Sequence, residues 1–402
     1  MATNNIGQPL AHGECVSAKV PSSYPPPVQT QGIQVTRLPT SASESTAQDD
    51  AHSTLHIYPH KDRHTHIKPT KDLSKESSWG KAARKARKEH KENGNVLEVS
   101  ESADGEGAFF LHSPYLAFHD PPKVLYMGAD RNATPIMLIH GGAFWRKYKL
   151  QLGSSIGTPG VIDPRGVVCW KHNGGDKHDL KADDKKLKGY KVRTWRLWGE
   201  TGKAYVHGTK ANRKAGIRPD PDVLDDLGYG EDGEIIEPAR AEEVVYLKWE
   251  RPFSRHTRRY HFQYAGVDFY WKGTGTVKKS GSCGFFVRFN HLKLVAKIPV
   301  AAASKKDRPE VCLAKYTCSL SGGKCGKLDI FDTALLRLAE EYVQPIGEIG
   351  IEQEEAVKIA RLKKTLLYQI VIATGLCMVS AEKEKRKAVW EWLQEAGEGA
   401  GG

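Results

Sequence analysis

The residues best suited to chemistry lie in two short motifs that follow one another along the chain. The first is "PIMLIHGGAFW", Pro135 to Trp145, in which an apolar run ends in His-Gly-Gly. Backbone N–H groups in such a loop can stabilise the oxyanion of a tetrahedral intermediate. The second is "GSSIG", which places Ser155 in the nucleophile position of a Gly-x-Ser-x-Gly motif. Together the two motifs would suit acyl transfer.

The first motif resembles the oxyanion loop of the lipase and carboxylesterase branch of the α/β-hydrolases, and this resemblance implies a serine hydrolase. The spacing argues against that function. His140 and Ser155 are fifteen residues apart, whereas parallel strands with crossovers of about a dozen or more residues each separate the two motifs in that fold. His291 is the last histidine, and no helix-rich region precedes it. A serine hydrolase remains an alternative, and we expect Gly141 and Gly142 to form a hairpin turn or bulge.

Other motifs that could hold a ligand are incomplete. The glycine-rich stretches "GTG" and "SGGKCGK" do not match a phosphate-binding loop. Cys312, Cys318 and Cys325 are spaced by six and seven residues, unlike a zinc knuckle. The histidines of "HKDRHTH", His60 to His66, could bind a metal ion adventitiously, but the stretch does not supply a complete coordination site. We therefore expect no cofactor and no metal.

The charge of the chain limits the kinds of partner. Lys and Arg number 60 against 48 Asp and Glu, which gives a formal net charge of +12. Anionic surfaces such as phospholipid headgroups or nucleic acid are natural partners of a basic protein. The seven cysteines are odd in number, and the N-terminus has no apolar signal segment. We expect an intracellular protein, cytoplasmic or nuclear or peripheral on a membrane, and not a secreted one.

Composition divides the chain near residue 115. Residues 1–115 are rich in Pro, Ser, Thr and Gln and contain few large apolar residues, so they are predicted to form a disordered, basic N-terminal arm. Within the arm, "KAARKARKEHKE" from Lys81 to Glu92 is strongly basic. It could be a nuclear-import signal or an anionic-surface tether, or only a solvated charged segment.

From Lys123 to about Ile330 the apolar residues alternate with a period of two. Tyr148, Leu150 and Leu152 share one face of a predicted strand, and "RRYHFQYAGVDFYWKG" and "HLKLVAKIP" repeat the pattern. Turn signals separate these runs, so about nine or ten antiparallel strands are predicted. Phe144 and Trp145, after the glycine pair, are expected to pack inside them. The fold class is mainly β, with one closed or nearly closed antiparallel barrel.

A segment near the C-terminus has a helical rather than a strand pattern. Asp332 could cap a helix over "TALLRLAEEY". "TLLYQIVIATGLCMVS", residues 365–380, is apolar on every side, so it could be a membrane anchor, a helix enclosed by protein or a buried strand pair. As a helix it spans about 24 Å, short of the roughly 30 Å of a bilayer core. We predict a central helix enclosed by the barrel.

A barrel of antiparallel strands followed by an apolar helix resembles the tubby C-terminal-like superfamily, including its LURP-one-related and phospholipid-scramblase members. The resemblance covers about residues 118–382 and depends on element order, the strand "VDFYWKGTGTV" and the late helix. It implies a domain over residues 116–395 and a non-catalytic module that meets membranes or partner proteins. The phosphoinositide-binding residues of the family cannot be placed on this sequence.

Basic residues next to aromatic ones are the candidate binding site. "RPFSRHTRRY" and "YKVRTWRLW" place cations beside tyrosines and tryptophans, an arrangement that suits phosphate recognition at a lipid surface. Solvated strand faces with cation–π contacts are the alternative. The sequence predicts a non-enzymatic module that docks on anionic phospholipid or a protein partner, with nucleic acid as a further possibility that no reader motif supports. The candidate anion-binding and lipid-binding residues are Arg255, Arg258, Arg259, Lys191 and Arg193.

Overall fold

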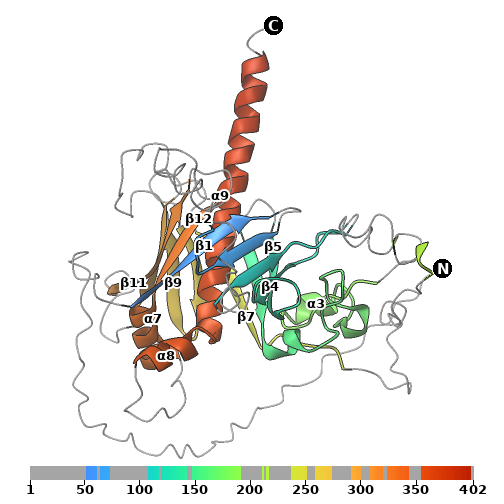
Figure 1. The fold of residues 1–402 in the computed structure, drawn as a ribbon, viewed down its shortest axis with the longest axis horizontal. Coiled ribbons are helices and arrows are strands. Elements are labelled where there is room, and N and C mark those ends of the chain that lie inside the picture. Colours follow the sequence, from blue (N-terminus) through green and yellow to red (C-terminus); the bar gives the residue numbers. More distant parts are fainter. Residues whose placement is uncertain are drawn as a thin grey trace, which may run out of the picture. The chain divides into compact units, whose positions relative to one another are not determined.

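The computed structural model describes residues 51–60, 64–72, 107–116, 119–142, 147–191, 211, 214–216, 237–250, 259–273, 291–299, 308–319, 324–343 and 355–399. Twelve strands in this part of the chain form one closed barrel in which every neighbouring pair is antiparallel. The strands follow one another around the ring in chain order. β1 pairs with β12 to close it, and Figure 1 shows these two strands next to each other. The predicted closed antiparallel barrel is confirmed.

The strands are short, and most have six residues or fewer. Their bounds are β1 His52–Pro59, β2 Thr65–Lys68, β3 Phe109–His112, β4 Lys123–Met127, β5 Thr134–Gly141, β6 Lys147–Leu152, β7 Glu243–Trp249, β8 Arg259–Tyr264, β9 Val267–Lys272, β10 Leu292–Lys297, β11 Glu310–Cys318 and β12 Gly326–Phe331.

The predicted extent of the disordered arm is wrong. The strands β1, β2 and β3 all lie before residue 116, inside the segment that composition assigned to the arm. Without them β4 and β12 would be open edges, because β1 pairs with β12 and β3 pairs with β4. Isolated strands among Pro-rich and Ser-rich stretches do not raise the average apolar content enough to be noticed. Residues 1–50 and the basic run Lys81–Glu92 lie outside the described residues.

Alternation along the strands produces two different faces. Leu150 and Leu152 on β6 belong to the core inside the barrel, as do Phe109 and Leu111 on β3. On β5 the residues that alternate with the core, such as Leu138, belong instead to a second apolar cluster on the outer wall. A strand whose two faces are both covered carries large apolar residues on both, as β4 and β5 do.

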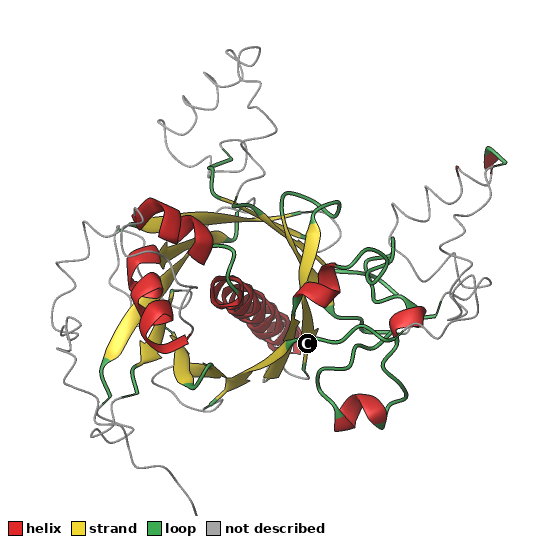
Figure 2. Ribbon diagram, turned by 90° about the horizontal axis from the view of Figure 1, so that it is seen from below, coloured by secondary structure: helices red, strands yellow, loops and turns green. Residues whose placement is uncertain are grey.

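The helix α9, Leu366–Gly399, runs through the barrel, and Figure 2 shows it inside the ring of strands. Residues 367–379 of this helix are all buried, which confirms the prediction of an enclosed helix, although α9 continues well beyond residue 380. Trp271 on β9 donates its indole N–H to Thr374 Oγ1 at 3.0 Å, deep in the core. A Cβ built on Gly375 would approach the Trp271 ring to 3.4 Å, so glycine lets the helix lie close to this strand.

Two shorter helices precede α9 in the chain. α7, Asp332–Leu338, packs against β1, β11 and β12, and α8, Glu355–Leu362, packs against α7. Asp332 is the first residue of α7 and makes no capping hydrogen bond; its carboxylate instead accepts from the Ser53 hydroxyl at 2.5 Å. Within the described residues no single helix is long and apolar enough to cross a membrane, whereas α8 and Leu366–Ala381, bent by 57° at their junction, meet that test as a pair.

The chain leaves the barrel after β6 and forms a small structure of its own, here called the insertion, residues 153–191. It contains the 3-10 helices η3, Ser154–Gly157, and η4, Trp170–His172, and the short helix α3, Asp179–Ala182. Ile156, Val161, Val168 and Leu187 of the insertion pack on the outer apolar cluster of β3, β4 and β5. The insertion therefore shields the outward apolar residues of these strands from solvent.

The Trp271–Thr374 hydrogen bond provides a test of the enclosed helix. Thr374→Val keeps the volume of the side chain but leaves the buried indole N–H of Trp271 without an acceptor. An unsatisfied buried donor costs about 1–3 kcal/mol, and the free energy of unfolding in urea should fall by that amount. Thr317→Val on β11, at a half-buried residue, is the matched control and should change it by less than about 0.5 kcal/mol. Equal effects of the two substitutions would contradict the packing described.

Candidate functional site

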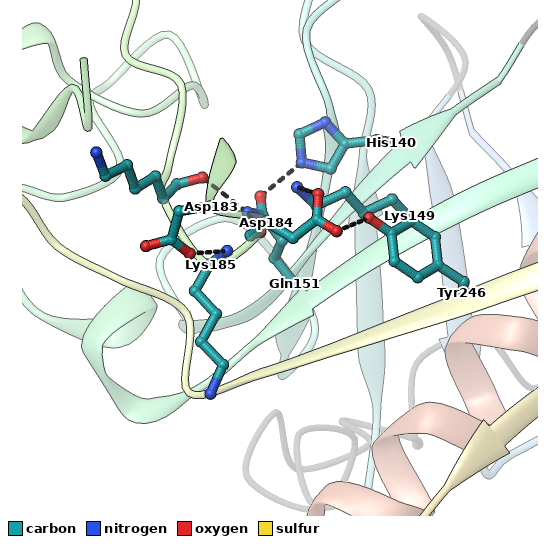
Figure 3. Close-up of polar contacts among 8 residues, drawn as sticks. His140, Lys149, Gln151, Asp183, Asp184, Lys185 and Tyr246 are labelled. Carbon is teal, nitrogen blue, oxygen red and sulfur yellow. Dashed lines mark hydrogen bonds and ion pairs between the residues drawn. The ribbon is translucent and has the colours of Figure 1, made fainter. Parts of the chain in front are cut away.

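The candidate site is the outer wall of β5, β6 and β7, where the insertion docks through polar contacts (Figure 3). Alternation turns His140 on β5, Lys149 and Gln151 on β6, and Tyr246 on β7 away from the core residues of the same strands. These side chains meet Asp184 and the backbone around it, which belong to the insertion. The site therefore joins a rigid sheet to a segment with little regular structure.

Gln151 is the centre of these contacts. Its side chain is 1% exposed, and its amide nitrogen donates to the carbonyl oxygens of Asp184 at 2.7 Å and Lys186 at 2.9 Å. Its Oε1 consequently faces His140 Nε2 at 2.7 Å. Since a neutral imidazole donates from one nitrogen only, Nε2 of His140 carries the proton. Burial lowers the pKa of His140 to about 4, against the opposing effect of the hydrogen bond to Gln151, so the ring is neutral at pH 7.

The two aspartates of the insertion next to this centre are held by the barrel and by its flanking chain. Asp184 accepts from the Tyr246 hydroxyl and from Lys149 Nζ at 3.1 Å, and the tyrosine hydrogen bond is the main reason why the pKa of Asp184 is lowered. Asp183 pairs with Arg240 at 2.5 Å, and its pKa is lowered chiefly by a hydrogen bond from the backbone N–H of Lys185. Both carboxylates are therefore ionised at neutral pH, and both form hydrogen bonds or ion pairs with the partners just named.

The residues of the acyl-transfer motifs are used in other ways. Gly142 N donates to Lys147 O at 2.8 Å and Gly141 pairs with Tyr148, so the glycine pair leads into a hairpin, as expected from the sequence. Ser155 lies in η3 and its hydroxyl donates to the carbonyl oxygen of Arg240. The His140 ring is engaged by Gln151 and no hydrogen bond joins it to Ser155. Phe144 and Trp145 lie outside the described residues.

The candidate anion-binding residues are only partly within the described chain. Arg259 on β8 lies over the Tyr270 ring at 4.2 Å, and its Nε is 3.3 Å from Glu250 Oε2. Lys191 ends the described part of the insertion, with its Nζ 4.3 Å from the centre of the Trp170 ring. Both residues therefore make cation–π contacts, as in the alternative interpretation in which these cations lie on solvated faces and contact aromatic rings. Arg193, Arg255 and Arg258 lie outside the described residues.

Sequence reasoning missed how charge is divided within the insertion. Its aspartates at 176, 179, 183 and 184 accept hydrogen bonds from the insertion or the barrel wall. Its lysines make no ion pair in the part of the chain that the structure describes, and Lys188 and Lys191 lie over aromatic rings. The lysines are Lys171, Lys177, Lys181, Lys185, Lys186, Lys188 and Lys191. From the sequence "DKHDLKADDKKLKGYK" one would instead pair neighbouring aspartates and lysines with each other.

A second histidine lies beneath the insertion, on β3. His112 Nε2 is 3.3 Å from the carbonyl oxygen of Arg165, and its Nδ1 is buried without a hydrogen-bond partner. Its ring stacks on His64 at 4.5 Å. Burial, followed by the nearby His64, lowers the pKa of His112 to about 4. The described residues contain no group of three or more His, Cys, Asp or Glu side chains that could hold a metal ion.

The twelve-stranded closed barrel with its C-terminal helix is consistent in architecture with tubby-like barrels. Comparison with known proteins found no matching family model, no similar curated protein and no similar solved structure.

Removing the central amide should loosen the insertion. Gln151→Leu deletes the two donors to the insertion backbone and leaves the His140 donor without its acceptor. Each lost buried hydrogen bond costs about 1 kcal/mol, so amide hydrogen exchange over residues 183–188 should become at least about tenfold faster. Gln263→Leu, at an exposed residue of β8, should leave that exchange unchanged. Unaltered protection in Gln151→Leu would show that the amide does not hold the insertion.

The two histidines under the insertion should make stability depend on pH. Their folded-state pKa values, about 4, lie below the ordinary value of 6.5. The unfolded chain therefore binds protons first, and stability is lost as pH falls below 6.5. Proton linkage predicts that the free energy of unfolding falls by up to about 2 kcal/mol per histidine between pH 7 and pH 5. Urea unfolding of the parent and of the His112→Asn/His140→Asn variant at both pH values measures this, and identical pH dependence in the two proteins would contradict it.

Proposed function

We propose that this protein is a non-enzymatic binding module that docks on anionic phospholipid surfaces through the lysines of the insertion. The observation that carries the proposal is the division of charge in the insertion. Its aspartates are occupied by hydrogen bonds and ion pairs, whereas its seven lysines have no ion-pair partner in the described chain. The insertion has seven lysines and Arg165 against five aspartates, so it carries a formal net charge of +3.

A phospholipid surface suits this arrangement of charge. Lysine side chains near an anionic membrane contribute about 1 kcal/mol each, without the fixed bidentate geometry that a single phosphate site needs. Tyr115 adds an interfacial aromatic residue: it is 60% exposed, and the next residue, Leu116, packs on Val167 and Tyr190 of the insertion. Tyrosine side chains are favoured at the headgroup level of a membrane. This aromatic residue favours a membrane over nucleic acid.

Two further observations support binding rather than catalysis. The interior of the barrel is filled by α9, and the apolar side chains of strands and helix form one continuous core. The residues of the acyl-transfer motifs take part in contacts that hold the insertion and the β5–β6 hairpin. The architectural resemblance to tubby-like barrels implies the same kind of role, a module that meets membranes or partner proteins.

Vesicle flotation tests the proposal. The full chain should float with vesicles that contain phosphatidylserine and not with pure phosphatidylcholine, and raising the salt concentration should weaken the association because exposed charges are screened. Lys181→Glu, Lys185→Glu and Lys188→Glu together should reduce the affinity by at least about a hundredfold. These three lysines are exposed, so the variant should fold normally.

The matched control reverses three lysines outside the insertion, Lys293, Lys315 and Lys364. It changes the net charge equally and should retain most of the binding. Equal losses in the two triple variants would reduce the effect to overall charge and contradict a docking surface on the insertion. Loss of duplex DNA binding in the insertion variant, without any binding of the parent to vesicles, would assign the surface to nucleic acid instead.

A further inference from the structure

A cavity of about 230 Å³ lies at one end of the barrel, between the β5–β6 hairpin and α9. The glycine pair of the His-Gly-Gly motif lines it from one side, and Leu376, Cys377 and Ser380 of α9 line it from the other. This volume is large enough to hold a small organic molecule. The cavity is separate from the lysines of the insertion, so its role does not depend on membrane docking.

An exposed glycine at the end of β5, Gly141, forms part of the cavity wall. Met137 and Ile139 point into the core, and alternation places Gly141 on the same face two residues later. A Cβ built on Gly141 would meet no atom within 4 Å. A larger residue would therefore fit sterically at this position. The floor of the cavity is apolar, with Leu111 and Ile139 from the strands and Leu376 from the helix.

A lysine also faces inward at this end of the barrel. Lys123 on β4 lies directly opposite Ile139 on β5, so the two side chains share the inner face. Lys123 is half-buried and has neither an ion pair nor a hydrogen bond from its side chain among the described residues. Burial raises the pKa of the Cys377 thiol to about 12, and the positive charge of Lys123 opposes this, which places the ammonium group near that thiol.

The mouth of the cavity carries the opposite charge. Asp120 and Glu384 both line it, both are exposed, and neither forms an ion pair within the described residues. A half-buried cation and two exposed carboxylates lining the same cavity would disfavour a simple anion near the carboxylates and a simple cation near the lysine. A molecule with one charge of each sign satisfies both groups, and the apolar floor requires that it also has an apolar body.

We infer that this cavity binds a small zwitterion with an apolar side chain, of the size and kind of a branched aliphatic amino acid. Its carboxylate would accept from Lys123, its ammonium group would face Asp120 and Glu384, and its side chain would lie on the apolar floor. Charge-assisted hydrogen bonds are about twice as strong as neutral ones, so both charged groups of the ligand should contribute to affinity.

Three probes that differ in one group each test the inference by isothermal titration calorimetry of the full chain. L-leucine carries both charges, 3-methylbutylamine lacks the carboxylate, and 4-methylpentanoate lacks the amine. L-leucine should bind with a Kd below about 1 mM and at least about tenfold more tightly than either analogue, as expected for one charge-assisted hydrogen bond. No binding of L-leucine at millimolar concentration, or equal binding of all three probes, would overturn the inference.

Variants of the chain separate the cavity from its surroundings. Lys123→Met should weaken L-leucine about tenfold while leaving 3-methylbutylamine unchanged, because only the carboxylate contact is lost. Lys147→Met is the matched control on the opposite face of the same sheet, since Lys147 is exposed beside the Tyr246 ring; it should change nothing. Gly141→Leu should abolish L-leucine binding by filling the cavity. Full binding in Gly141→Leu, or equal losses in the two lysine variants, would contradict the site.

Discussion

The burial of a helix that is apolar on every side is the constraint on which the rest of the structure depends. Residues 367–379 of α9 have no face suited to water, and the inward residues of the strands have no other surface to pack against. Closure of the ring satisfies both, because twelve antiparallel strands leave no open edge and enclose the helix. Trp271 and Thr374 add the one kind of polar contact that such a core tolerates, a buried donor with its acceptor.

Because α9 fills the interior of the barrel, a binding site has room only on the outer wall or at the ends of the barrel. The wall of β3, β4 and β5 is apolar outside as well as inside, and the insertion covers it with its own apolar residues. The hydrogen bonds of Gln151 then fix the backbone of the insertion. Asp184 of the insertion also helps to hold it, by accepting a hydrogen bond from Tyr246. The lysines of the insertion form no ion pair within the described residues, and two of them, Lys188 and Lys191, lie over aromatic rings. The same alternation that builds the core leaves Gly141 and Lys123 facing a small cavity at the barrel end.

Patterns within one element were predictable from the sequence. Periods of two and the all-round apolar segment near residue 370 gave the barrel and its helix, because those patterns follow directly from which faces are buried. β2 and β3 were missed because four residues each are too few to show a period within a polar stretch. The candidate site was missed for another reason: Asp184 meets Tyr246, and Asp183 meets Arg240, across some sixty residues of chain. Which lysines remain unpaired depends on such distant contacts.

Native-state hydrogen exchange along α9 tests the central claim most directly. If the barrel encloses the helix, the amides of residues 370–379 can exchange only when the barrel itself opens. Their exchange free energies should then equal the global free energy of unfolding and should fall with urea at the same slope. Exchange of these amides through small local openings, at a free energy well below that of global unfolding and insensitive to urea, would show that the helix is not enclosed and would contradict the account.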